Sequence, residues 1–188
     1  FNDRALHATL IAELEEVIPS AADAGVEKLL VMSGNRRGRT EAQGIAAFAD
    51  GLRQILPTAE RHGVTLCLEM LNSTVDHADY DADSTRYGLE VAQRVGSPNF
   101  RLLYDIYHMQ VMEGNVLATI EANRDAIVHL HTAGVPGRHE LDDTQELNYR
   151  GIARALVELE FEGYIAHEFI PTREPIGALR DAVDVCRV

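Results

Sequence analysis

The sequence of 188 residues has one lysine, two cysteines and no apolar run long enough to cross a membrane. A membrane-spanning helix needs roughly 18 consecutive apolar residues, so we expect no membrane partner. The first residues, Phe1–Arg4, lead directly into an amphipathic pattern, which predicts that no signal peptide is present. The only lysine, Lys28, begins an apolar stretch, and this position disfavours Schiff-base chemistry.

Positive charge is scarce throughout the chain. The 17 basic residues stand against 30 acidic ones, and the formal net charge is −13. An acidic surface repels phosphate backbones, so we expect no nucleic acid partner. The two cysteines, Cys67 and Cys186, lie in apolar stretches, which favours small buried thiols in a reducing compartment over a disulfide. We therefore predict a cytoplasmic protein.

Short apolar runs alternate with longer stretches of helical periodicity. The runs are rich in Val, Ile, Leu and Tyr, and they predict strands at 28–32, 64–69, 101–105, 127–131 and 164–168. They read as continuous apolar runs, as expected for strands that are buried on both faces. Strands that alternate with helices indicate a parallel sheet covered by helices, and thus an α/β fold.

Apolar residues at spacings of three and four predict the helices between these strands. The stripes are Leu6, Leu10, Leu14 and Val17; Ile45, Phe48, Leu52, Ile55 and Ala59; Leu89, Ala92 and Val95; and Ile152, Leu156 and Leu159. We expect Pro57 to kink or end the second helix. Asp83-Ser84 stands before the third stripe and indicates a capped helix start, and Asn148 is a possible N-cap of the fourth helix.

The number of units is lower than in a closed barrel. We count a leading helix and five βα units in one domain, residues 1–188, whereas a complete (β/α)8 TIM barrel has about 250 residues. The alternatives are a smaller open sheet and a barrel whose first strands are absent from this chain. An open half barrel exposes apolar strand edges, so we favour the later five βα units of a barrel.

The last four predicted strands each end in a residue that can bind a metal: Glu69, Asp105, His131 and Glu168. Successive members are separated by 26 to 37 residues, about one βα unit each. Parallel strands bring their carboxyl ends to one rim, where barrel active sites lie. One acidic residue at a strand end is more often a helix cap or loop residue. Four in succession favour a shared site.

Three carboxylates at one rim repel each other unless a cation lies between them. Oxygen ligands with one imidazole suit Mn²⁺, Mg²⁺ or Co²⁺ better than a structural zinc ion, which prefers sulfur and nitrogen. The sequence therefore predicts a divalent metal site formed by these four residues.

Four further polar residues follow the predicted strand ends. His108 and Asn72 each stand three residues after a proposed ligand, and Arg138 and Glu140 belong to the loop 135–140. We predict that these side chains bind the substrate, with the loop closing over an anionic group. The alternative is that they are ordinary loop residues.

Several motifs that occur in order resemble hydroxypyruvate isomerase and its relatives among the xylose isomerase-like barrels. They are Leu102–Gly114 (LLYDIYHMQVMEG), Val135–Glu140 (VPGRHE), Glu146–Tyr149 (ELNY), Cys67–Asn72 (CLEMLN) and Gly163–Glu168 (GYIAHE). The resemblance extends from about residue 21 to residue 171. It implies a (β/α)8 TIM barrel of which this chain carries the later strands.

The resemblance also implies an activity, namely divalent-metal-dependent aldose–ketose isomerisation of a sugar or keto acid through an enediolate. The family's metal ligands match Glu69, Asp105, His131 and Glu168, and its acid/base pair matches Glu69 and Glu168. Its substrate contacts match His108 and Arg138. Because barrel relatives associate through their helices, we expect a homo-oligomer.

One departure leaves alternatives open. Hydroxypyruvate isomerases often have glutamine where this chain has His131, and histidine there resembles the ketose 3-epimerases. A nucleic acid hydrolase of the same superfamily is a second alternative, but it would need a trinuclear zinc cluster and a basic face. A non-catalytic accessory subunit that binds metal or sugar is the third.

Overall fold

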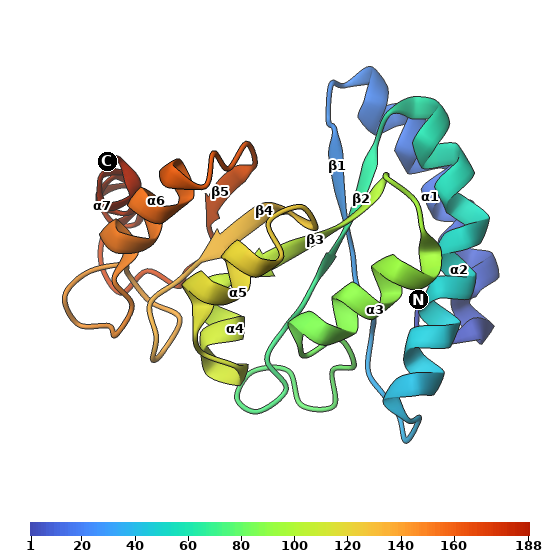
Figure 1. Ribbon diagram of the computed structural model, residues 1–188, viewed down its shortest axis with the longest axis horizontal. Helices are drawn as coiled ribbons and strands as arrows, with labels where there is room; N and C mark the ends of the chain where they lie inside the picture. The colour runs from blue at the N-terminus through green and yellow to red at the C-terminus, as the bar shows by residue number, and fades with distance from the viewer. The chain divides into compact units, whose positions relative to one another are not determined.

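The computed structural model describes residues 1–188, which form two compact units, Phe1–Leu103 and Tyr104–Val188. The first unit contains a 3₁₀ turn at Arg4–Leu6, followed by α1 (His7–Asp23), β1 (Lys28–Val31), α2 (Glu41–His62), β2 (Thr65–Glu69), α3 (Thr85–Val95) and most of β3 (Phe100–Asp105). The second contains the end of β3, α4 (Ile106–Met112), α5 (Val116–Ala122), β4 (Ile127–Thr132), α6 (Tyr149–Glu158), β5 (Tyr164–His167) and α7 (Pro175–Cys186) (Figure 1).

The strands are parallel, as the sequence predicts. In the first unit β2 pairs with β1 and with β3, and Glu69 lies opposite Leu103 in the second of these pairs. In the second unit β4 pairs with β5, with His131 opposite Ala166. The strand order within the first unit, β1-β2-β3, follows the order in the sequence. This order arises when each helical crossover returns the chain next to the strand before it.

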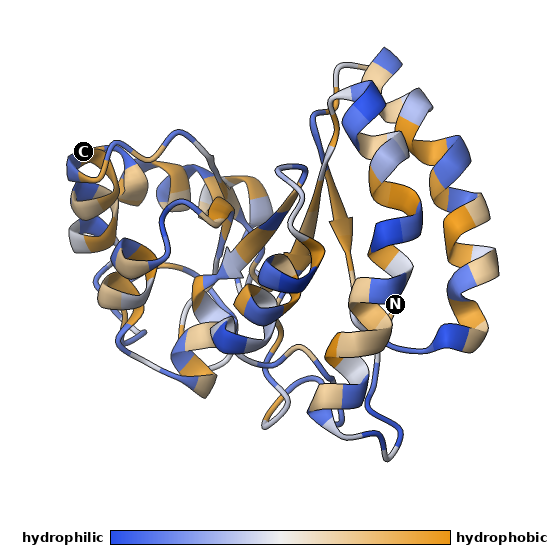
Figure 2. Ribbon diagram, turned by 45° about the vertical axis from the view of Figure 1, so that its right-hand side comes forward, coloured by the Kyte–Doolittle hydropathy of each residue, from blue (hydrophilic) through white to orange (hydrophobic).

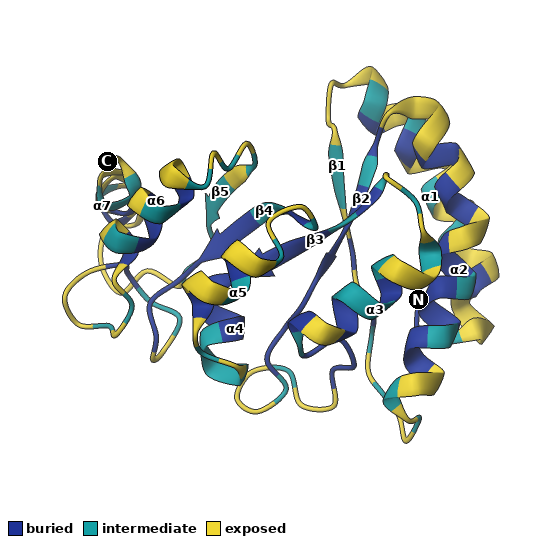
Figure 3. Ribbon diagram, viewed as in Figure 1, coloured by how far each residue is buried: buried dark blue, intermediate teal, exposed yellow.

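All five predicted strands are present, and their ends lie within one residue of the expected positions. Strands β2 and β3 are buried along nearly their whole length, as their continuous apolar sequences require (Figure 3). The outer strands are less covered, since Leu30 in β1 and Tyr164 in β5 are 45% and 60% exposed.

Helix α2 forms the centre of the helical layer of the first unit. It packs against α1 on one side and α3 on the other (Figure 1). The five apolar residues predicted for its stripe are all buried. Thr40 and Gln43 form a reciprocal capping box at its start, and Gly63 ends it with a φ of 68°.

Pro57 is expected to kink or end α2, and it does not end the helix. The helix continues five residues further, to His62. A proline inside a helix removes one backbone hydrogen bond. Burial of its neighbours Ile55, Leu56 and Ala59 offsets that loss, because removing apolar side chains from water stabilises the packed helix.

The buried face of α1 also differs from the predicted stripe. His7, Ile18 and Ala21 are its buried residues, whereas Leu6 and Val17 are nearly half exposed. The predicted stripe instead lines a groove of about 390 Å³ together with β1. The apolar residues of its lining are Phe1, Leu6, Leu10, Leu14, Val17, Leu30, Val31 and Met32. The alternation of polar and apolar residues along the helices is visible in Figure 2.

The capped start predicted at Asp83-Ser84 and the N-cap predicted at Asn148 are confirmed. The side chain of Ser84 accepts a hydrogen bond from the Tyr87 amide, and that of Asn148 accepts one from the Gly151 amide. The cysteines are free, and burial raises the pKa of Cys67 to about 11. None of the helices combines the length and the apolar character that a membrane crossing requires.

Candidate metal centre

Asp105 has two roles because it is both the last residue of β3 and the N-cap of α4. Its Oδ1 atom accepts a hydrogen bond from the His108 amide at 3.0 Å. The carboxylate is 1% exposed, and Oδ2 faces Nδ1 of His131 at 3.9 Å. One oxygen therefore caps the helix, and the other is directed to the imidazole.

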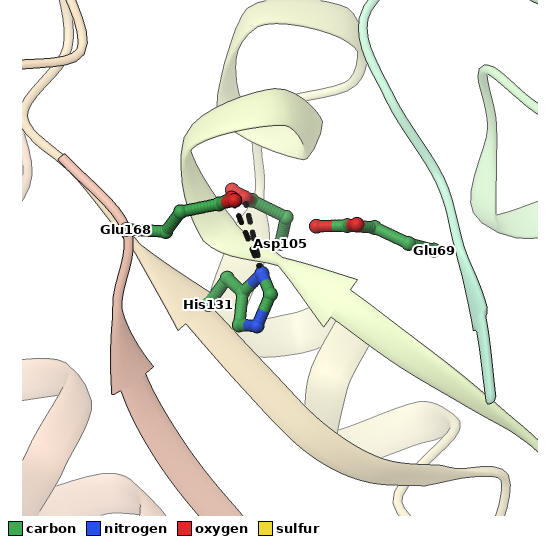
Figure 4. Close-up of side chains that lie close together, drawn as sticks. All are labelled: Glu69, Asp105, His131 and Glu168. Carbon is green, nitrogen blue, oxygen red and sulfur yellow. Dashed lines mark ion pairs between the residues drawn. The ribbon is translucent and has the colours of Figure 1, made fainter. Parts of the chain in front are cut away.

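His131 lies near the carboxyl end of β4 and faces two carboxylates. Its Nδ1 atom is 3.3 Å from Oε2 of Glu168, in addition to its approach to Asp105 (Figure 4). Each of these three residues offers a ligand atom within 4.8 Å of the others. Ligands bound about 2.1 Å from one ion are roughly 3 Å apart when adjacent and roughly 4.2 Å apart when opposite. The spacing of the three side chains fits a single divalent ion.

Glu168 follows β5 directly, and its side chain is 51% exposed. Oε2 of Glu168 accepts a hydrogen bond from Nη2 of Arg138 at 2.7 Å. Its pKa is lowered to about 2, mainly by the hydrogen bond with His131 and further by the charge of Arg138, against the opposing effect of partial burial. The carboxylate is thus ionised at neutral pH, as a metal ligand or a general base must be.

Glu69 ends β2 in the first unit and is 5% exposed. It lies opposite Leu103, which is two residues before Asp105 in β3. Because side chains alternate along a strand, Leu103 and Asp105 share one face of the sheet. Figure 4 draws Glu69 together with the three ligand candidates of the second unit. The Tyr80 hydroxyl, which also accepts from the Ser33 amide at 3.1 Å, donates to the carbonyl of Glu69 at 3.2 Å.

The chemistry of this donor set fits a hard divalent ion. Asp105 and His131 are buried, and buried carboxylates are costly without a counter-charge. A set that combines carboxylate oxygens with one imidazole suits Mn²⁺, Mg²⁺ or Co²⁺. Asp105, His131 and Glu168, all in the second unit, form a group that could hold such an ion.

Two predicted substrate contacts lie beside this group. His108 is fully buried in α4, and its Nε2 atom is 3.8 Å from Oδ2 of Asp105. Arg138 has a φ of 59°, and its guanidinium carbon lies 5.6 Å from the centre of the Tyr107 ring. The contact with this ring and the ion pair with Glu168 hold the arginine in one place.

The other two predicted substrate contacts make hydrogen bonds within the protein. Oδ1 of Asn72 accepts from the amides of Val75 and Asp76, and Nδ2 donates to the Asp76 carboxylate at 2.7 Å. Both carboxylate oxygens of Glu140 accept hydrogen bonds from Thr172. Burial raises the pKa of Glu140, but the hydrogen bonds from Thr172 and from the amides of Glu140 and Arg173 together lower it by more.

Sequence reasoning missed Tyr80 and Thr172. Neither residue ends a strand or belongs to a helical stripe, so periodicity carries no signal for it. Neither residue belongs to the motifs that carry the family resemblance, because those motifs lie mainly at the strand ends.

Comparison with known proteins gives the family. Residues 2–187 match the family model described as xylose isomerase-like TIM barrel. The 2-oxo-tetronate isomerase of Cupriavidus necator is 32% identical over 126 residues, 67% of this chain and 48% of that protein. The hydroxypyruvate isomerase of Escherichia coli (strain K12) is 30% identical over 135 residues, 72% of this chain and 52% of that protein. The chain thus spans about half the length of these relatives.

Solved structures show the same fold. The crystal structure titled AP endonuclease, family 2 from Brucella melitensis has a TM-score of 0.78 at 26% identity, over 90% of this chain and 68% of that one. D-psicose 3-epimerase with D-tagatose from Clostridium cellulolyticum H10 has a TM-score of 0.78 at 18% identity, over 99% and 73%. The identity to the epimerase is so low that this likeness concerns the fold alone.

Proposed function

Because the chain belongs to the xylose isomerase-like TIM barrel family, we propose that it is a divalent-metal-dependent isomerase of a small keto acid or sugar, similar to hydroxypyruvate isomerase. The observation that carries this proposal is the convergence of Asp105, His131 and Glu168, whose ligand atoms are spaced for one ion. Glu69 is the proposed fourth ligand. Mn²⁺ or Mg²⁺ is the proposed ion, with Co²⁺ as a substitute.

Two carboxylates are assigned to proton transfer. Isomerisation beside a carbonyl requires that one carbon loses a proton and its neighbour regains one, through an enediolate. When bound, the metal ion would polarise the substrate oxygens and stabilise the negative charge. Glu69 and Glu168 are the proposed acid/base pair. The hydrogen bond with His131, and secondly the charge of Arg138, lower the pKa of Glu168 and keep this carboxylate ionised.

The remaining site residues are proposed to bind the substrate. His108 and Arg138 present nitrogen donors next to Asp105 and Glu168, which suits the hydroxyl and carboxylate oxygens of a small acid. For Asn72 and Glu140 a direct substrate contact stays a prediction. The free thiols support a reducing compartment such as the cytoplasm, and association into a homo-oligomer also stays a prediction.

The test is turnover of a panel of small keto acids and ketoses by the purified protein, with Mn²⁺ and with a chelator. We expect metal-dependent interconversion of a keto acid such as hydroxypyruvate. The variant Glu158→Gln, an exposed carboxylate on α6, should behave as the unchanged protein does. Tight Mn²⁺ binding without any turnover would instead favour the accessory-subunit alternative.

A 3-epimerase is the second candidate, because His131 stands where hydroxypyruvate isomerases often have glutamine. The same panel separates the two: epimerisation of a ketose at carbon 3 without aldose–ketose exchange would replace the isomerase proposal. The likeness to the Brucella melitensis structure makes abasic DNA a further substrate to assay. We expect no cleavage, because the chain has a formal net charge of −13.

A further inference from the structure

The loop after β4 and the segment after β5 are joined by several hydrogen bonds. The Ile170 amide donates to the carbonyl oxygen of Arg138 at 2.7 Å. Nδ1 of His139 lies 2.9 Å from the carbonyl oxygen of Ile170. The two oxygens of Glu140 accept from Thr172, one from the amide at 2.7 Å and the other from the hydroxyl at 3.0 Å. We call this set of contacts the strap.

Glu140 is the buried anchor of the strap. It is 4% exposed, and a carboxylate that is removed from water is costly unless it is hydrogen-bonded. Thr172 supplies a bond to each oxygen of Glu140, so the pair specifies where segment 168–172 lies relative to the loop. A surface carboxylate that waited for substrate would not need two fixed partners.

The loop itself is compact, so that a displacement of Glu140 would be passed on to its neighbours. The Gly134 amide donates to the carbonyl of His139, and the Arg138 amide donates to the carbonyl of Gly134, both at 2.9 Å. A β-carbon at Gly134 would lie only 2.3 Å from the carbonyl oxygen of Glu140. Only glycine therefore permits this close approach.

The strap ends at the candidate metal centre. Arg138, two residues before Glu140, donates to Glu168, which stands four residues before Thr172. Phe169 packs against the buried cluster formed by Tyr107, Ala133 and Val135. The backbone around the Arg138–Glu168 pair is thus held by contacts that do not involve the two side chains of the pair.

We propose that Glu140 is a positioning residue, which acts through Thr172 to hold Glu168 and Arg138 in the geometry that binds the metal ion. This inference rests on the proposed function, and for Glu140 it is an alternative to the direct substrate contact predicted from the sequence. Its carboxylate acts by its shape and its hydrogen bonds to Thr172 rather than by its charge.

The experiment compares Mn²⁺ affinity, kcat and KM in four variants. Glu140→Ala removes both hydrogen bonds with Thr172. In Glu140→Gln the amide oxygen can still accept from the Thr172 amide, and the amide nitrogen can donate to the Thr172 hydroxyl. Thr172→Val removes the hydroxyl bond, and Thr172→Ser restores it. Glu158→Ala is the matched control on the exposed face of α6. The concentration of free Mn²⁺, measured by electron paramagnetic resonance during a titration, gives the Mn²⁺ affinity.

We expect Glu140→Ala to weaken Mn²⁺ binding roughly 10- to 100-fold, the usual effect of removing a group that orients a ligand. It should lower kcat more than it raises KM. Thr172→Val should have a smaller effect, and Glu140→Gln and Thr172→Ser should stay near the unchanged protein. The double variant Glu140→Ala/Thr172→Val should be no worse than Glu140→Ala, because Glu140→Ala already removes the bond that Thr172→Val deletes.

Three results would overturn the inference. One is unchanged Mn²⁺ affinity in folded Glu140→Ala. Another is Glu140→Gln being as damaging as Glu140→Ala, which would assign the effect to charge. The third is a rise in KM alone with no effect of Thr172→Val, which would restore a direct substrate contact.

Hydrogen exchange separates this inference from the proposed function. Exchange at the amides of Ile170 and Thr172 should be slow, and it should be faster in Glu140→Ala. If exchange is unchanged in that variant, the positioning role is wrong, even if the unchanged protein binds Mn²⁺ as proposed. If exchange is accelerated in Glu140→Ala but the unchanged protein binds no Mn²⁺, the proposed function is wrong. The positioning role assigned to the strap is then wrong as well.

Discussion

Nη2 of Arg138 lies 2.7 Å from Oε2 of Glu168, the same carboxylate oxygen that faces Nδ1 of His131 at 3.3 Å. One oxygen thus receives a cationic donor from the loop after β4 and an imidazole from the strand itself. A bound ion would share this carboxylate with Arg138, so the arginine limits how Glu168 can turn.

The metal-free protein should lose stability in acid partly through Glu168. Its folded-state pKa is about 2 and its ordinary value is 4.5. The unfolded state therefore binds more protons between these values, so the contribution is complete above pH 4.5 and is lost as the pH falls toward 2. Denaturant unfolding in chelator from pH 2 to 6 measures it. Glu168→Gln should flatten this dependence and Glu158→Gln should not; an equal slope in both contradicts the assignment.

Mn²⁺ should raise the melting temperature by mass action. At a free concentration 100 times Kd the stabilisation is about 2.7 kcal/mol. Asp105→Asn and His131→Ala should reduce or abolish the shift, since each removes a proposed ligand. The control is His62→Ala, which changes an exposed histidine at the end of α2. This variant should keep the full Mn²⁺-induced shift of the melting temperature. If the protein binds no Mn²⁺, or if both ligand variants keep the full shift, the ligand assignment is wrong.

Glu168→Gln should fold normally and lose turnover. Removal of a positioned general acid or base costs about 10² to 10⁴ in rate, and the variant also weakens a proposed ligand. Mn²⁺ affinity is therefore measured in parallel, and turnover is compared at saturating metal. Near-normal kcat under those conditions would remove Glu168 from the acid/base pair.

Tyr80→Phe should destabilise the first unit. The hydroxyl accepts from the Ser33 amide and donates to the carbonyl of Glu69, so its loss leaves buried groups without partners. The expected cost is about 1 to 3 kcal/mol in the free energy of unfolding. The control is Tyr164→Phe, because Tyr164 is 60% exposed. Equal stability of the two variants would show that the Tyr80 hydroxyl contributes little.

The sequence by itself determined the strands and the residues at their ends. Strands that are buried on both faces must be continuously apolar, and this made the runs ending at Glu69 and Asp105 visible without coordinates. Capping also depends on local hydrogen bonds, so Ser84 and Asn148 could be recognised from their neighbours. The family motifs lie at the same strand ends, where parallel strands direct their last side chains to one rim.

Only the tertiary structure decided which groups meet across the chain. The bond from Tyr80 to Glu69 and the bonds from Thr172 to Glu140 join residues that are 11 and 32 positions apart, and no periodicity relates them. The buried face of α1 and the continuation of α2 through Pro57 also depend on what packs against each helix. Local propensity is worth a fraction of a kcal/mol per residue, so burial against a neighbouring element outweighs it.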